Sequence, residues 1–318
     1  MLVYGVKLAS VPLFLFSNSL YQGQYLFMRL SFSSAHYTFH KITLLTSSIR
    51  HALLVSSAIL LSMDTAFANI VIDDDATEGA TTTIIAPNNH IQAVDFSDNS
   101  GAAIRINDSN GANGLLTING GVTVSSSDLE AVVVGGGGTA SVSITNAGTL
   151  SSVLNGLLVQ DGAELTAFDN TGGIIEATGT GAGLYLQEDQ DNAITNAGII
   201  RNTANGDGLK LDSEAQTQDF TNTGTISSNS GIAINADTAM AGATNGFVNT
   251  GTISGGGAAI DAEAAFTLTN SGTVTGNIEH ATSGALIISQ TAGAITGNIT
   301  STADAAHSLN LTGGSITG

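Results

Sequence analysis

The sequence predicts an all-β fold, a parallel β-helix in which the chain returns to the same face every 20 to 27 residues. Two observations predict it. A short phrase built around Asn and Gly recurs along the chain, and a second phrase, Gly followed by alternating apolar residues, lies between its copies. A period of this length is typical of a solenoid, because a β-propeller would need about 40 or more residues per blade.

The first 68 residues are predicted to be an N-terminal extension and a secretory signal. Residues 47–68 contain a basic flank at Arg50 and an apolar run, and they end in Ala66-Phe67-Ala68. This order is typical of a signal peptide that is cleaved after Ala68, and the apolar run is too short for a membrane-spanning helix.

The true start of translation is open, since Met28 would give a long signal of the same kind. Residues 69–116 are predicted to be a cap or irregular first coils. They begin near an Asp triplet at 73–75, which we interpret as a solvated end.

Residues 117–318 are predicted to form the regular coils, with the chain ending in the middle of a repeat. The six clearest copies of the first phrase are spaced by 24, 26, 26, 27 and 21 residues. Their turns are predicted at Asn146 and Gly148, Asn170 and Gly172, Asn196 and Gly198, Asn222 and Gly224, Asn249 and Gly251, and Asn270 and Gly272. We expect the Gly residues to supply positive φ at each corner and the Asn side chains to bond along the stack.

The second phrase predicts a strand with two inward apolar residues and one outward residue between them. Its copies are GLLV, GLYL, GLKL, GIAI and GAAI, at 156–159, 183–186, 208–211, 231–234 and 257–260. The middle positions predicted to face solvent are Leu158, Tyr185, Lys210, Ala233 and Ala259. Alternation of this kind indicates a strand and not a helix.

An acidic stripe is the one candidate metal site. Asp189, Glu214, Asp237 and Glu263 each lie three residues after the last apolar position of the second phrase. Stacked carboxylates could bind Ca²⁺, which prefers six to eight oxygen ligands. The alternative interpretation is a solvated edge, where solvent screens the like charges.

Charge and motifs exclude several functions. All acidic residues except Asp64 lie in 69–318, against only Arg105, Arg201 and Lys210, so a nucleic-acid partner is not expected. The chain has no Cys, which removes disulfide and thiolate chemistry.

No catalytic motif is predicted. Ser109, beside Asp108, is the nearest match to a protease nucleophile, and none of the three His residues after the signal (90, 280 and 307) stands in a recognisable relation to it. We therefore expect no enzyme and no cofactor, apart from the open question of Ca²⁺.

Together, the signal pattern, the absence of Cys and the repeated NxGxI and GxxI phrases resemble the passenger region of bacterial autotransporters over roughly residues 50–318. The resemblance implies a right-handed parallel β-helix that is displayed at the cell surface. It also implies a C-terminal outer-membrane barrel, which the sequence up to Gly318 does not contain, so contact with the outer membrane would depend on that missing part.

The function expected from these features is a β-helical stalk or adhesin, exported through the inner membrane, that contacts host or neighbouring-cell surface molecules. Two alternatives stay open. One is a passenger enzyme that acts on polysaccharide or protein, and the other is a purely structural spacer.

Overall fold

A computed structural model describes residues 2–8, 11–20, 23–29, 70–72, 82–83, 89–92, 96–98, 102–106, 113–135, 141–187, 190, 192–212, 219–237, 246–281 and 283–318. The chain divides into two units, Met1–Ala66 and Phe67–Gly318. The predicted signal cleavage residues, Ala66 and Ala68, lie outside the described residues, as does Ser109.

The first unit contains a three-stranded antiparallel sheet. Strand β2 (Val11–Leu20) pairs on one side with β1 (Leu2–Leu8) and on the other with β3 (Gly23–Arg29).

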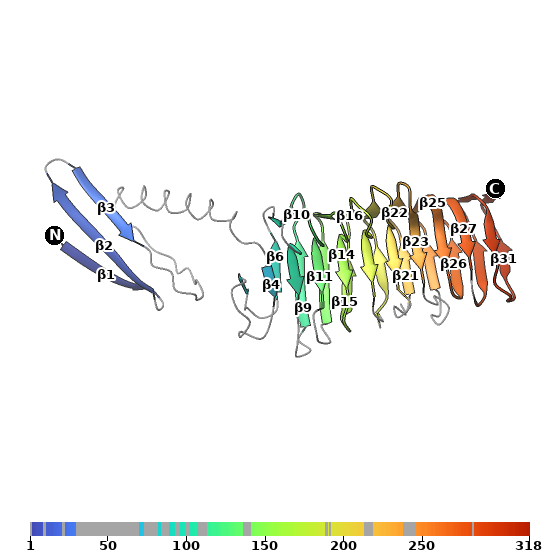
Figure 1. Cartoon of the computed structure of the whole chain (residues 1–318), viewed down its shortest axis with the longest axis horizontal. Helices are drawn as coiled ribbons and strands as arrows, with labels where there is room; N and C mark the ends of the chain where they lie inside the picture. Colours follow the sequence, from blue (N-terminus) through green and yellow to red (C-terminus); the bar gives the residue numbers. More distant parts are fainter. Residues whose placement is uncertain are drawn as a thin grey trace. The chain divides into compact units, whose positions relative to one another are not determined.

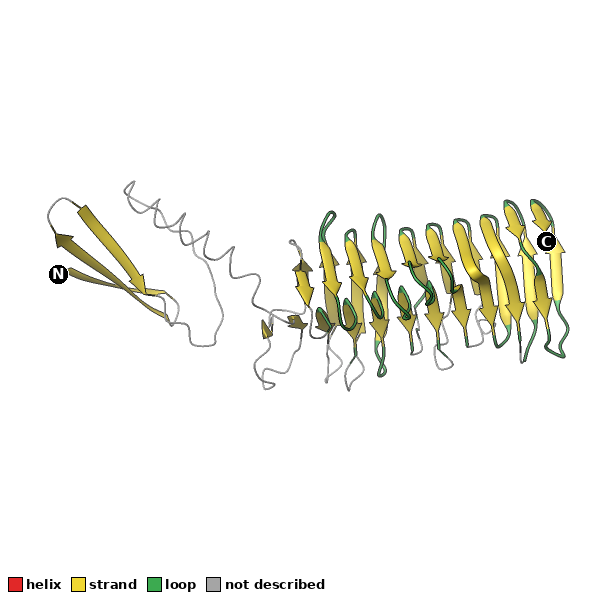
Figure 2. Ribbon diagram, turned by 45° about the horizontal axis from the view of Figure 1, so that its top comes forward, coloured by secondary structure: helices red, strands yellow, loops and turns green. Residues whose placement is uncertain are grey.

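The second unit is a stack of coils, and its strands lie side by side along the unit from the green to the red end of the chain in Figure 1. Each coil contributes one strand to each of three ladders, which we call the first, second and third faces in chain order. All ladder pairings along the three faces are parallel, so every coil runs in the same direction as the one below it. The prediction of an all-β parallel solenoid is confirmed, and no helix occurs among the described residues (Figure 2).

The three faces are defined by their hydrogen-bonded ladders. The first face comprises β6 (Asn89–Gln92), β9 (Asn113–Ile118), β12 (Ser141–Asn146), β15 (Glu164–Asp169), β18 (Ile194–Asn196), β21 (Asp219–Asn222), β24 (Gly246–Asn249), β26 (Phe266–Asn270), β28 (Leu286–Gln290) and β31 (Ser308–Leu311). The second comprises β7 (Phe96–Asp98), β10 (Thr123–Ser126), β13 (Thr149–Ser152), β16 (Ile174–Ala177), β19 (Ile199–Asn202), β22 (Thr225–Ser228), the first halves of β25 (Thr252–Ala262) and β27 (Thr273–His280), β29 (Ala294–Thr296) and β32 (Ser315–Thr317). The third comprises β4 (Ile70–Ile72), β8 (Ile104–Ile106), β11 (Val132–Val134), β14 (Leu157–Val159), β17 (Leu184–Leu186), β20 (Leu209–Leu211), β23 (Ile232–Ala236), the second halves of β25 and β27, and β30 (Ile299–Ser301), while β5 (Thr82–Thr83) pairs with β4.

The corners between faces differ in how much their length varies. At the first corner, from the first face to the second, two to four residues separate the strands, and the number is two in half of the coils, as at 223–224 and 250–251. At the third corner, which leads to the next coil, the connection ranges from 263–265 to 237–245. The uneven spacing of the Asn phrase therefore arises largely at the third corner, where an added residue leaves the stacked ladders in place.

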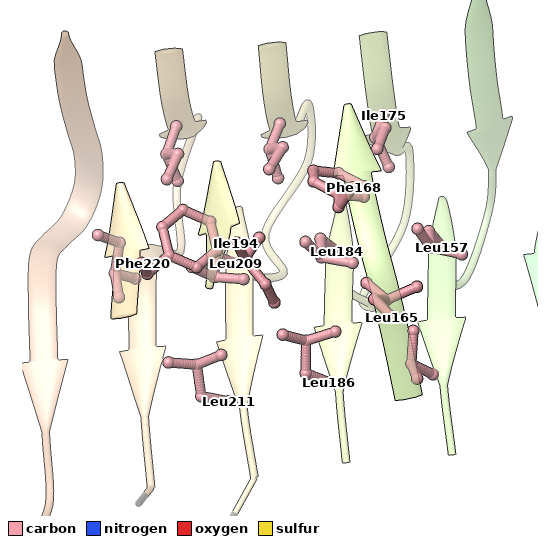
Figure 3. Packing of buried hydrophobic residues seen from close by; sticks show 14 of the residues in the cluster. Leu157, Leu165, Phe168, Ile175, Leu184, Leu186, Ile194, Leu209, Leu211 and Phe220 are labelled. Atoms are coloured by element: carbon pink, nitrogen blue, oxygen red, sulfur yellow. The ribbon is translucent and has the colours of Figure 1, made fainter. Parts of the chain in front are cut away.

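Inward side chains of all three faces form one continuous apolar core. Burial alternates along most strands, so that Leu184 and Leu186 are buried while Tyr185 between them is half-buried. Figure 3 shows Leu157, Leu184 and Leu209 from successive coils of the third face pointing into this core. Phe220 and Phe247 stack face to face with ring centroids 4.9 Å apart. Stacking of coils is therefore what removes the apolar surface of each repeat from water.

The predicted register of the second phrase is correct in the coils of Tyr185 and Lys210 and wrong further on. Leu209 pairs with Ile234 and Lys210 with Asn235, two residues later than the phrase GIAI predicts. As a consequence, Ala233 is fully buried instead of facing solvent. Ala259 is fully buried in the next coil, and Leu158 is also buried, in a small apolar cluster with Val133 and Tyr185.

Candidate functional site

A buried ladder of side-chain amides follows the first corner through seven coils. In every link, the Nδ2 atom of one residue donates to the side-chain oxygen of the equivalent residue in the next coil. The links are Asn146 to Asn170 (2.8 Å), Asn170 to Asn196 (2.9 Å), Asn196 to Asn222 (2.9 Å), Asn222 to Asn249 (2.8 Å), Asn249 to Asn270 (2.7 Å) and Asn270 to Gln290 (2.8 Å). All seven residues are fully buried, so these bonds satisfy groups that water does not reach.

Each amide of the ladder also contacts the backbone of the corner. Asn222 Nδ2 lies 3.3 Å from the carbonyl oxygen of Gly224 and 3.2 Å from that of Thr252 in the next coil. The backbone N–H of Gly198 donates to Asn196 Oδ1 at 3.3 Å. The ladder thus fixes both the corner within a coil and the distance between coils.

Gln290 is the residue of this ladder that the sequence pattern did not reveal. The copy of the phrase in that coil contains no Asn, and the turn to Ala294 is one residue longer than in the coil before. The longer Gln side chain nevertheless places its Oε1 atom within 2.8 Å of Asn270 Nδ2. An amide at the last position of the first-face strand is the signal that would have found it.

The Gly residues of the phrase are required by close packing and not by positive φ, which corrects the prediction. Gly148, Gly198, Gly224, Gly251 and Gly272 all have φ values outside the left-handed region. A Cβ atom placed on any of them would lie 2.0 to 2.4 Å from a carbonyl oxygen of the preceding coil, far inside van der Waals contact. A side chain at these positions would therefore push adjacent coils apart.

These packed Gly residues form a column along the first corner, which we call the Gly column. The phrase predicts that Gly172 belongs to it, but Gly172 does not. In that coil Gly173 occupies the packed position, because Thr149 pairs with Ile174 and a Cβ on Gly173 would lie 2.3 Å from the carbonyl oxygen of Asn146. Gly172 itself has φ of 75° and open space around it. It supplies the left-handed turn that one extra residue at this corner needs.

The acidic stripe does not form as predicted. The backbone N–H of Asp237 bonds to the carbonyl of Leu211, and that of Glu263 bonds to the carbonyl of Ala236. These bonds align Asp237 and Glu263 with Asp212, the first residue after its third-face strand. The prediction had placed them at the third residue after the strand. Asp189 and Glu214 lie outside the described residues.

A different set of carboxylates gathers on the outward side of the third face and its corner. We call Asp207, Asp237, Asp261, Glu263 and Glu279 the acidic patch. Asp261 pairs with Asn235 in the coil before and with Glu279 in the coil after, so carboxylates follow one another along the stack.

The pKa values of two members of the acidic patch, Asp261 and Asp207, are raised. Burial is the main cause for Asp261, and the negative charges of Glu279, Glu263, Asp237 and Asp207 add to it. The pKa of Asp207 is raised mainly by burial, although its bond from Asn235 Nδ2 at 2.9 Å acts in the opposite direction. Both shifts mean that the folded protein disfavours the charged form of these groups.

Tyr185 and Lys210 border the acidic patch on two adjacent coils. The hydroxyl of Tyr185 donates to Asp212 Oδ2 at 2.6 Å, while burial and this bond raise the pKa of the Tyr185 hydroxyl. Lys210 Nζ lies 5.1 Å from the centre of the Tyr185 ring and 3.8 Å from Asp237 Oδ2. The surface therefore combines an aromatic ring, one ammonium group and several carboxylates.

The described residues contain no group of three or more His, Asp or Glu side chains arranged to hold a metal ion. The carboxylates of the acidic patch are spread along the stack and do not converge on one point that a metal ion could occupy. The Ca²⁺ hypothesis thus receives no geometric support from this part of the chain.

A second cluster, at the C-terminal coils, was not predicted. It joins His280, Ser301 and His307. Ser301 lies one coil of 21 residues after His280. The coil length of 21 residues is the sequence signal that could have revealed this cluster, because it places Ser301 next to His280 in the stack.

Comparison of the chain with models of protein families, with curated protein sequences and with solved structures finds no match. The class of protein is therefore defined by its architecture, a parallel β-solenoid with a buried amide ladder. Within the part of the chain that the structure describes, no helix is long and apolar enough to cross a membrane.

Proposed function

We propose that this solenoid is the stalk of a surface-displayed or secreted passenger of the autotransporter type, and that it acts in adhesion or cell–cell contact without catalysis. Support for a stalk comes from the amide ladder, which runs through seven coils, and from the apolar core, which is continuous along the stack. Export through the inner membrane follows in this proposal from the signal pattern of residues 47–68.

The observation that carries the adhesive part is the outward third face. Tyr185, Lys210 and the acidic patch lie on consecutive coils of this face, beside the corner at which the connections vary in length. Length variation at one corner gives a surface that differs from coil to coil while the core stays constant. This is the property that a display scaffold needs.

The charge of the patch favours a basic partner. Four neighbouring carboxylates contribute to the raised pKa of Asp261, so their mutual repulsion is present in the isolated protein. A cationic surface on a host or neighbouring-cell molecule would offset that repulsion on binding. The contact would weaken as salt increases, because exposed charges are screened.

Adhesion of beads coated with the purified chain tests this proposal. The beads are applied to layers of bacterial and animal cells and to polylysine-coated glass, at low and at physiological salt. The variant Asp237→Asn with Asp261→Asn and Glu263→Gln should adhere several-fold less. The control variant Asp128→Asn with Glu164→Gln and Asp169→Asn removes the same number of charges elsewhere and should adhere like the natural chain.

Equal adhesion of the two variants would show that the patch is not the contact surface. Failure of the natural chain to adhere to any of these surfaces would favour the spacer alternative.

A further inference from the structure

His280 occupies a core position that is apolar in the coils before it. It ends β27 and aligns with Ala262 and, one coil earlier, with Ala236. Its side chain is only 2% exposed, yet both ring nitrogens have partners: Nε2 lies 2.9 Å from the carbonyl oxygen of Ala264, and Nδ1 lies 2.8 Å from Ser301 Oγ.

His307 contacts the same hydroxyl from the other side. Its Nε2 atom lies 3.1 Å from Ser301 Oγ and 3.1 Å from the carbonyl oxygen of Ala303. Its Nδ1 atom lies 3.0 Å from the backbone nitrogen of Leu286. The two imidazole rings meet edge to face, with centroids 5.5 Å apart.

The backbone partners fix the proton on each ring. A carbonyl oxygen can only accept, so we assign the proton of neutral His280 to Nε2, where it is donated to Ala264. The N–H of Leu286 can only donate, so we assign the proton of neutral His307 to Nε2, on the side of Ser301 and Ala303. The hydroxyl of Ser301 then accepts from His307 and has one acceptor for its own proton, His280 Nδ1.

This arrangement gives Ser301 the partners of an activated nucleophile. A base lies within hydrogen-bonding distance of the hydroxyl, and a third group orients that base. Ser301 is half-buried, whereas His280 is buried behind it, so solvent reaches the hydroxyl before it reaches the base.

We propose that Ser301 is an acyl-acceptor site, modified by an activated ester or thioester of a small carboxylic acid with His280 as the base. In the reaction Ser301 Oγ attacks the carbonyl carbon and forms a new C–O bond, while its proton passes to His280 Nδ1. The bond from that carbon to the leaving oxygen or sulfur breaks, and the leaving group takes the proton from His280. The product is an ester on Ser301, which goes beyond the adhesive function proposed above and requires no turnover.

The probe is p-nitrophenyl acetate, applied to the purified full chain, with the acetylated residues located by digestion and mass spectrometry. Ser308 is the internal control, because it is an exposed serine in the adjoining strand β31. General-base assistance contributes at least about 10²-fold, so Ser301 should be acetylated about 10²-fold faster than Ser308.

Two further measurements separate activation from simple exposure. In the variant His280→Gln, the ratio of Ser301 to Ser308 acetylation should fall towards one. The second measurement uses the natural chain unfolded in urea, where Ser301 and His280 no longer meet and the same ratio should again fall towards one. The second measurement stands even where the variant loses the fold of its last coils.

A ratio near one in the folded natural chain would overturn the proposal, as would a high ratio that unfolding in urea leaves unchanged.

Discussion

At the scale of single residues, the amide ladder is notable for its uniform direction. Every link from Asn146 to Gln290 has its donor in the earlier coil and its acceptor in the later one. Hydrogen bonds aligned in this way polarise one another in a buried, low-dielectric site. The loss of one member removes an amide partner from each of its two neighbours.

Asn222→Ala tests this coupling. The substitution removes the amide partner of Asn196 Nδ2 and of Asn249 Oδ1 in the core, and a buried polar group that loses its partner costs about 1 to 3 kcal/mol. We expect a loss of about 3 kcal/mol in the free energy of unfolding, measured by urea denaturation. Asn229→Ala removes an exposed side chain with a single bond to the Thr203 carbonyl and should cost about 1 kcal/mol or less. Similar costs for the two variants would contradict the coupling.

The pKa shifts of Asp261 and Asp169 predict opposite effects of pH. The pKa of Asp261 is raised, so the folded state binds its proton more tightly than the unfolded chain, and ionisation of Asp261 destabilises the fold as pH rises above about 3.8. The pKa of Asp169 is lowered by its bonds to the side chain and backbone of Thr171, so its stabilisation is present above that pH and is lost on acidification.

We therefore expect Asp261→Asn to raise the melting temperature at pH 7 and Asp169→Asn to lower it. The Asp261 difference should shrink as the pH falls towards about 3.8, whereas the Asp169 difference should shrink only below about 3.8. Thermal unfolding of the three proteins across this pH range is the measurement. A destabilised Asp261→Asn variant at pH 7 would show that Asp261 is stabilised by contacts which outweigh its repulsion.

At the scale of strands and corners, the Gly column sets how closely successive coils approach. Gly251 lies under the carbonyl oxygen of Gly224, and a Cβ there would be 2.1 Å from it. Gly120 lies at the same corner of an earlier coil, but the nearest atom to its Cβ would be 3.7 Å away. The two Gly residues therefore occupy the same corner, but only Gly251 is packed too closely to accept a side chain.

Gly251→Ala should destabilise the protein by about 3 kcal/mol, because the coils must separate or the corner must move. Gly120→Ala should change stability by no more than about 0.5 kcal/mol, since an ordinary surface substitution has an effect of that size. Urea denaturation of both variants decides the matter, and equal effects would mean that the Gly column is not a packing constraint.

The sequence predicted the strands correctly where the same residue types recur at the same spacing. The Asn phrase has its amide, its Gly and its apolar residue at nearly constant offsets, so the first face and first corner could be read directly, except in the coil of Asn170, where one extra residue moves the packed position to Gly173. The third face could not be read beyond Lys210, because β23 and β25 are longer than the strands before them and Ala is compatible with either side. The two-residue error there also misplaced the acidic residues that follow.

The candidate sites depended on contacts that a linear pattern does not contain. The phrase predicted stacked Asn side chains, but not that a Gln at a longer turn would continue the ladder. Ser301 and His307 reach His280 through the coil length and a corner whose path no local motif specifies. The acidic patch required the true register of the third face before its members could be placed together.

At the scale of the whole solenoid unit, stability is distributed along the stack. Each coil of the ladder contacts its neighbours through the same amide link, the same Gly contact and the same apolar core. Such a unit approximates a one-dimensional array, in which local changes act mainly on adjacent coils. The effects of Asn222→Ala and Gly251→Ala should accordingly be confined to the middle of the ladder.

The interval of 21 residues that links Asn249 to Asn270 also links successive second-face strands from Thr252 to Ser315. A duplication or loss of one such unit in the gene would keep the reading frame and bring every inward residue back into register. Recombination between similar repeats could thus change the number of coils, and with it the length of the solenoid, without altering the residues at either end.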